Sequence, residues 1–209
     1  MTSFLEKEIN QQPDVINNLI TKHSSDIEKI TNSLRKKPPR FALIAARGTS
    51  DNAAIYAKYL LSGINKIPSG LAMPSLYTLY QFIPDMRDGL VIGISQSGQT
   101  PDVRAVLEAA QYQGVPTISI TNTKGAPITS IADYNIFVDA GEERSVAASK
   151  TYTGQLTAVA MLSAYLSADK QRIDDLISLP NYIQAALTQK SITQSIADRF
   201  SKKNHILKK

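Results

Sequence analysis

Residues 90–102 read Leu-Val-Ile-Gly-Ile-Ser-Gln-Ser-Gly-Gln-Thr-Pro-Asp, a short apolar run that passes directly into a polar loop. The run Leu90–Ile94 contains no polar side chain, which is typical of a strand covered on both faces of a sheet. Thr100 suits a helix N-cap and Pro101 suits the first helical position, so we expect a helix to begin there. A buried strand followed by a helix indicates a parallel α/β sheet.

Short apolar runs separated by helical patterns recur along the chain. Further strands are predicted at 41–46, 117–120 and 135–138, with a weaker one near 69–73. Helical patterns lie at 52–61, 76–81, 102–113 and 150–167. Because apolar strands alternate with helices, we predict one doubly wound α/β domain with a parallel sheet covered on both sides.

Helical segments flank this domain. Residues 3–34 carry apolar side chains at helical spacing and are predicted to form one helix that ends before Pro38 and Pro39. Amphipathic segments at 181–189 and 192–200 precede a lysine-rich end. We therefore divide the chain into an N-terminal helical segment (1–38), a central domain (39–170), and C-terminal helices with a basic tail (171–209).

Composition excludes several kinds of chemistry. The 209 residues include no cysteine and two histidines, His23 and His205. Disulfides, a thiolate nucleophile and a cysteine-ligated zinc are excluded, and a multi-histidine metal site or a Ser-His-Asp triad is not expected. We predict no metal and no cofactor, and any acid–base chemistry would fall to a carboxylate or a lysine.

The net charge of +5 comes from two short basic runs. One is Arg35, Lys36, Lys37 and Arg40, and the other is Arg199, Lys202, Lys203, Lys208 and Lys209. The remainder is net acidic and no nucleic-acid motif is present, so we predict no nucleic-acid partner. The N-terminus lacks a signal-peptide pattern, and the most apolar run, 156–166, is too short to span a bilayer. We predict a cytoplasmic protein without a membrane partner.

The loop after Leu90–Ile94 is a candidate phosphate site. Ser95, Gln96, Ser97 and Thr100 all carry donors for phosphate oxygens, and the loop ends at a helix N-terminus, which favours anions. Read from Gly93, it differs from the nucleotide P-loop by Gln99 in place of the lysine. A neutral, hydroxyl-rich loop suits a phosphate monoester better than a triphosphate. The alternative is an ordinary polar turn between a strand and a helix.

A second such loop follows the first strand. Gly48 allows a tight turn or a close approach to a ligand, and Thr49 or Ser50 could cap the next helix and present a hydroxyl to the same crevice. Both loops would open at the carboxyl edge of one sheet, where such folds bind ligands. Arg47 could pair with a carboxylate or with the ligand, and we leave it unassigned.

The third polar segment, 141–150, follows the last strand. Its small residues would let a sugar ring approach the backbone. Glu143 could bind hydroxyls or act as a base if desolvated. The favoured alternative is that Glu142 and Glu143 are solvated loop acids and that Ser149 caps the next helix.

These three loops resemble motifs of the sugar-isomerase (SIS) domain family. The motifs are Ala46–Asp51, Ile94–Thr100 and Ser145–Thr151, and Glu8–Pro13 is similar to the segment that precedes the first SIS domain of amino-sugar-phosphate synthases and deaminase/isomerase-like proteins. The resemblance extends over residues 5–170.

The resemblance implies a flavodoxin-like, five-stranded parallel sheet, a homodimer and a phosphorylated sugar as ligand. It implies phosphate contacts at Ser50, Ser95, Gln96, Ser97 and Thr100. Sugar contacts are implied near Val146 and Ala148, where Ala148 replaces a serine of the synthases. With Gly48 and Thr49 these residues complete the predicted site.

Two departures from the family matter. Synthases take ammonia from glutamine with a cysteine, which this chain lacks, so glutamine-dependent amination is not expected. In the family the catalytic lysine, glutamate and histidine lie in a second SIS domain, and this chain ends at Lys209, about where that domain would begin. We expect the half of an aldose–ketose isomerase or deaminase that binds the sugar phosphate, with catalytic residues unassigned.

Two other functions stay open. A non-catalytic sensor would bind the same sugar phosphate and report to a partner, although 40 residues before the first strand leave little room for a DNA-binding module. A nucleotide-binding protein is disfavoured, since the P-loop lysine and a G-x-G-x-x-G motif are absent.

Overall fold

A computed structural model describes residues 3–201. Its strands are Phe41–Ala45 (β1), Ser69–Leu71 (β2), Gly89–Ile94 (β3), Thr117–Thr121 (β4) and Tyr134–Phe137 (β5). Its helices are Phe4–Asn10 (α1), Gln12–Lys36 (α2), Thr49–Gly63 (α3), Pro74–Thr78 (α4), Pro101–Tyr112 (α5), Pro127–Ile131 (α6), Lys150–Ser167 (α7), Lys170–Leu187 (α8) and Lys190–Ser201 (α9).

The five strands form one sheet in the order β2-β1-β3-β4-β5, and every neighbouring pair is parallel. This is the flavodoxin-like order, so the predicted fold class is confirmed. The order reverses between β1 and β3, where Phe41 pairs with Gly89 and Ala45 with Gly93. A reversal of this kind opens a crevice at the carboxyl ends of the two strands.

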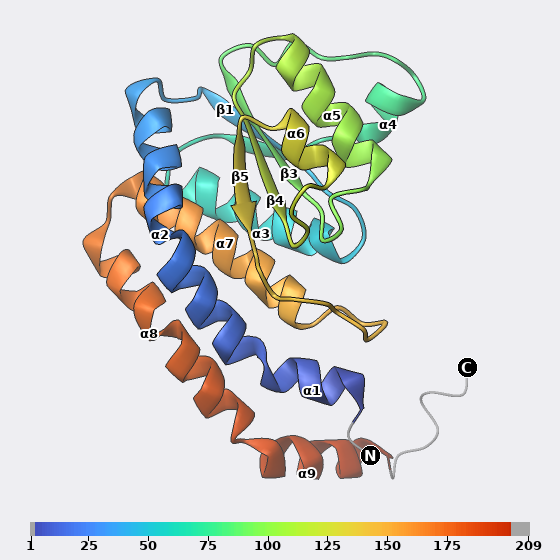
Figure 1. The fold of residues 1–209 in the computed structure, drawn as a ribbon, viewed down its shortest axis with the longest axis vertical. Coiled ribbons are helices and arrows are strands. Elements are labelled where there is room, and N and C mark those ends of the chain that lie inside the picture. The colour runs from blue at the N-terminus through green and yellow to red at the C-terminus, as the bar shows by residue number, and fades with distance from the viewer. Residues whose placement is uncertain (1–2, 202–209) are drawn as a thin grey trace.

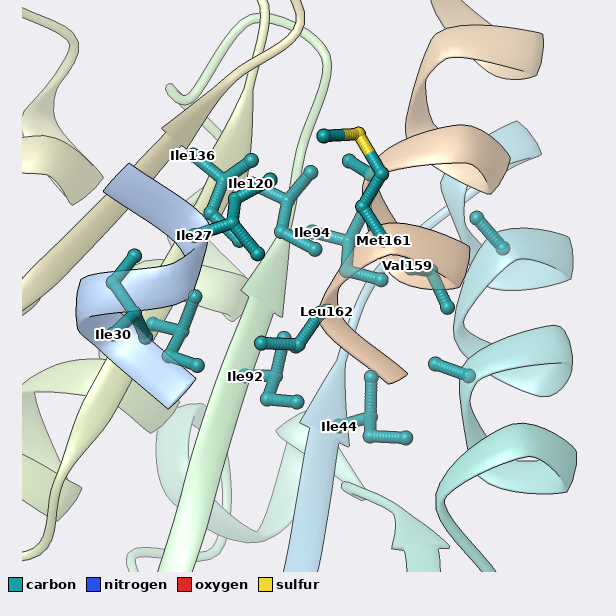
Figure 2. Close-up of a cluster of buried hydrophobic side chains, with 14 of the residues drawn as sticks. Ile27, Ile30, Ile44, Ile92, Ile94, Ile120, Ile136, Val159, Met161 and Leu162 are labelled. Carbon is teal, nitrogen blue, oxygen red and sulfur yellow. The ribbon is translucent and has the colours of Figure 1, made fainter. Parts of the chain in front are cut away.

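Helices cover both faces of the sheet (Figure 1). On one face α2, α3 and α7 pack against side chains that alternate along the strands, among them Ile44, Ile92 and Ile120. Figure 2 shows these isoleucines facing Met161 and Leu162 of α7. On the other face α5 packs against Val91 and Ala45 through Val103 and Leu107. This core fixes the strand ends that carry the loops.

The prediction of strands apolar on both faces is wrong for β4. Its second face carries Thr117, Ser119 and Thr121, all buried. Each hydroxyl is hydrogen-bonded: Thr117 Oγ1 donates to Asp133, and Ser119 Oγ donates to Asn135. Thr121 Oγ1 donates to the carbonyl of Gln96 at 3.2 Å. Burial of these hydroxyls is tolerated because each has a partner.

The N-terminal segment is two helices, where one was predicted. The break falls at Gln11, which caps α1 and precedes α2. Pro13 lacks an N–H group, and in a continuous helix its ring would collide with the carbonyl of Ile9. Apolar side chains of α2 then face the core as the spacing predicted.

The C-terminal helices also differ from the prediction. The chain is helical from Lys170 and passes through Pro180 without ending α8. Leu176, Leu179 and Ile183 pack against the core on both sides of the proline, and this packing offsets the lost hydrogen bond. Elsewhere α4 ends at Thr78, short of the predicted 81, and α6 was not predicted. His205 and the lysines of the basic tail lie outside the described residues.

Candidate functional site

The loops that follow β1 and β3 flank the crevice where the strand order reverses. In flavodoxin-like sheets this is the position at which ligands bind. The loop after β3, residues 95–100, joins it to α5, and the loop after β1, residues 46–48, joins it to α3. The sequence predicted both loops. They lie side by side because β1 and β3 are neighbours in the sheet.

The 95–100 loop is tied together by its own hydroxyls. Ser95 is buried; its Oγ accepts from the Gly98 N–H at 3.1 Å and lies 2.9 Å from Thr100 Oγ1. Thr100 is the N-cap of α5, as predicted, but its side chain makes no capping bond and faces Ser95. The first N–H groups of α5 have no intrahelical partner and point out of the helix end, where they favour an anion.

Gly98 gives the loop its shape. It adopts a φ of +64°, a conformation that L-residues rarely adopt. A Cβ added there would collide with Ala126 Cβ and lie 3.0 Å from Thr121 Oγ1. The turn therefore requires glycine for both its backbone angle and its space.

The loop after β1 contacts the same helix end. Gly48, with a φ of +59°, occupies the N-cap position of α3, which has no side-chain cap. The prediction that Thr49 or Ser50 caps this helix is therefore wrong; both lie in its first turn, Thr49 exposed and Ser50 buried. Arg47 Nε lies 2.9 Å from Asp102 Oδ2, at the start of α5. This ion pair answers the open question about Arg47 and links the two loops.

Hydrogen bonds extend this edge to the last strand. The carbonyl of Gln96 accepts from the N–H of Asn122, after β4, at 3.0 Å. The Asn122 side chain in turn donates to the carbonyl of Gly141 at 2.7 Å and accepts from the N–H of Ala140 at 2.8 Å. The loops after β3, β4 and β5 are thus joined at the carboxyl edge, and the 141–149 segment projects from it (Figure 1).

The structure shows Glu143 in neither of the two roles considered for it, a group that binds ligand hydroxyls or acts as a base and a solvated loop acid. Its carboxylate accepts from the backbone N–H groups of Ser149, Lys150 and Thr151, and from the hydroxyls of Ser149 and Thr151. It is neither a solvated acid nor a free base. Ser149 occupies the N-cap position of α7, but Glu143 supplies the capping oxygens.

Glu8 of α1 holds the other side of this loop. It is buried, and its carboxylate accepts from the N–H groups of Arg144 at 2.5 Å and Ser145 at 3.1 Å. Burial raises the pKa of this carboxyl, but these hydrogen bonds and the charge of Lys150 outweigh it, and the pKa lies below its usual value. Lys150 is also buried and donates to Gln11 Oε1 at 2.9 Å.

Residues 34–165 match the SIS domain family, a stretch that covers more than half of the chain. The chain belongs to the SIS domain family. Among curated proteins, the glutamine–fructose-6-phosphate aminotransferase of Aquifex aeolicus is 33% identical over 205 residues, which is 98% of this chain and 34% of that protein. The chain spans about a third of the length of the curated relatives it matches.

Solved structures show the same fold. The C-terminal domain of glucosamine-fructose-6-phosphate aminotransferase from Francisella tularensis matches with a TM-score of 0.84 and 26% identity, over 96% of this chain and 60% of that one. The Vibrio vulnificus NanR protein complexed with ManNAc-6P matches with a TM-score of 0.66 over 90% of this chain and 70% of that one. At 16% identity, that second likeness shows the fold alone.

The SIS fold brings together most of the predicted site residues. Gly48, Thr49 and Ser50 lie in the loop and first turn that Arg47 links to α5. The other predicted phosphate residues, Ser95, Gln96, Ser97 and Thr100, lie in the 95–100 loop. Val146 is fully exposed and Ala148 half-buried at the tip of the third loop, without a direct hydrogen bond to the other two. Glu8, Gln11 and Lys150 were not predicted to act here, although Glu8–Pro13 was part of the resemblance.

The described part of the chain offers neither a metal-binding cluster nor a membrane-spanning helix. No group of three or more His, Asp or Glu side chains there could hold a metal ion. Within residues 3–201 no helix is both long and apolar enough to cross a bilayer.

Glu143→Ala is expected to destabilise the fold by about 2 kcal/mol, because three N–H groups at the start of α7 lose their acceptor. At about 2–4 °C per kcal/mol for a chain of this size, the melting temperature should fall by about 4–8 °C. The matched control is Glu142→Ala, which removes an exposed neighbouring charge and should change little. An equal loss in both variants would assign the effect to loop charge and contradict the capping role.

Proposed function

We propose that this SIS domain binds a phosphorylated amino sugar or hexose, such as glucosamine 6-phosphate or fructose 6-phosphate. The observation that carries the proposal is the pair of loops at the β1/β3 crevice, one of which ends at the N-terminus of α5. A hydroxyl-bearing loop at a helix N-terminus offers several donors to a phosphate group.

The phosphate would lie on Ser95–Thr100, with Ser50 at its side, and the sugar would extend toward Val146 and Ala148. Three carboxylates at this edge already have partners: Asp102 pairs with Arg47, and Glu8 and Glu143 accept backbone N–H groups. None of the three is free to move a proton on the sugar. We therefore assign this chain the binding half of an amino-sugar-phosphate isomerase or deaminase, and no catalytic residue.

In the complete enzyme class, the chemistry is ring opening followed by proton transfer between C1 and C2 by a carboxylate base. The chain matches about a third of the length of a curated aminotransferase and 60% of a solved C-terminal domain of another. We propose that it acts as a homodimer, and that 39–170 forms the binding unit between the flanking segments 1–38 and 171–209.

A sugar-phosphate sensor is the second candidate. The observation that favours it is that the three carboxylates named above at this edge all have partners, so the described loops offer donors for binding while none of these carboxylates is free to act as a base. Both candidates require the same ligand, so binding alone does not separate them. Turnover of glucosamine 6-phosphate by this chain would support an enzyme, and binding without turnover would support a sensor or a binding half.

Saturating glucosamine 6-phosphate is expected to raise the melting temperature by about 5–11 °C, since ligand at 100 Kd adds about 2.7 kcal/mol. Melting curves with glucosamine 6-phosphate, glucosamine and inorganic phosphate check this. A shift with the phosphorylated sugar well above that with phosphate supports the proposal. No shift with any of the three contradicts it.

A further inference from the structure

The loop between β5 and α7 is held at two places by two carboxylates from different parts of the chain. Glu143 accepts from the N–H groups of residues 149–151, after the loop's tip. Glu8 accepts from the N–H groups of Arg144 and Ser145, before the tip. Between these fixed points lie three residues, 146–148.

The tip has a defined local conformation and faces solvent. Ser145 Oγ donates to the carbonyl of Ala147 at 2.8 Å, which closes a tight turn. Val146 is fully exposed in this turn. An apolar side chain presented on a fixed turn is suited to contact a ligand.

Glu8 reaches this loop from far away in the sequence, 136 residues before Arg144. A second contact joins α1 to the loop, since the Arg144 guanidinium lies 4.3 Å from the centre of the Phe4 ring. Beside it, Lys150 Nζ at the start of α7 donates to Oε1 of Gln11, the residue that follows α1. Because Glu8 is buried and charged, its hydrogen bonds are stronger than those between neutral groups. Helix α1 thus holds the loop in place.

We infer that Glu8 is a positioning residue that holds Val146–Ala148 in place for the sugar part of the ligand, while the phosphate loop is independent of it. This inference rests on the proposed function and deepens it. It assigns the segment before the SIS core a part in sugar selectivity. Without the Glu8 carboxylate, the N–H groups of residues 144 and 145 lose their hydrogen-bond acceptors, and the tip becomes free to move.

The test compares Glu8→Ala and Glu8→Gln with Glu6→Gln. Glu6 lies on the same helix and forms an exposed ion pair with Lys190, so it controls for a lost charge on α1. We expect Glu8→Ala to bind glucosamine 6-phosphate about 10-fold more weakly than the wild type, and inorganic phosphate equally well. Glu8→Gln keeps one acceptor oxygen and should lose less. Glu6→Gln should match the wild type.

Hydrogen exchange of the unliganded protein gives a second readout. We expect faster exchange of the Arg144 and Ser145 amides in Glu8→Ala and no change in Glu6→Gln. Unchanged protection in Glu8→Ala would overturn the inference whatever the ligand is. An equal loss of affinity for phosphate and for glucosamine 6-phosphate would also overturn it, because it would show a general structural effect. A wild type that does not prefer the phosphorylated sugar contradicts the proposed function instead.

Discussion

Gly98→Ala should lower the free energy of unfolding by about 3 kcal/mol. A left-handed backbone costs an L-residue about 1–2 kcal/mol, and overpacking against Ala126 adds about 1–3 kcal/mol. The 95–100 loop must shift to relieve the collision, so we also expect binding of glucosamine 6-phosphate to be lost. Urea unfolding and a binding titration of the same variant measure both effects.

Gly125→Ala is the matched control. Gly125 also has a positive φ, +72°, but a Cβ there would meet no atom within 4 Å. It should lose only the backbone contribution, about 1 kcal/mol, and keep its affinity for the ligand. If both variants lose the same stability, the collision with Ala126 does not matter and the crowded turn is not what fixes the loop.

Ser97→Asp should weaken binding of glucosamine 6-phosphate by about 100-fold or more. Ser97 is half-buried in the candidate phosphate loop, and its Oγ accepts from the Gln99 N–H at 3.3 Å. Like charges about 4 Å apart near a protein surface repel by about 4 kcal/mol before screening by salt. Isothermal titration at fixed ionic strength measures the loss.

Two variants make that result specific. Ser97→Ala removes one hydroxyl and should weaken binding by about 2- to 12-fold. Ser25→Asp adds the same charge at an exposed position of α2 and should bind like the wild type. Equal binding by Ser97→Asp and Ser25→Asp would mean that the phosphate does not lie on this loop.

The sequence was most informative where a local pattern determines the structure. Apolar runs predicted the strands, and hydroxyls before Thr100 and Pro101 predicted a loop that ends at a helix N-terminus. The SIS resemblance predicted the five-stranded parallel order, which the sheet confirms. These features depend on neighbours in sequence or on a family pattern.

What the sequence did not predict depends on contacts between distant segments. Glu143 reads as an exposed loop acid until α7 presents three N–H groups to it. Glu8 lies 136 residues from the amide it accepts from, and no local pattern relates them. Pro180 is a helix breaker by local rules, and packing of Leu176 and Leu179 on the core overrides it.

The packing of α2 against α7 affects how the chain is made. The apolar face of α2 leaves the ribosome before α7, and 113 residues separate the end of α2 from the start of α7. At about 5–20 residues per second, α7 follows only about 6–23 s later. During synthesis, the face of α2 that carries Leu19 and Ile27 therefore remains uncovered until α7 has been made. A chaperone that binds short apolar segments of nascent chains should find its site on this helix.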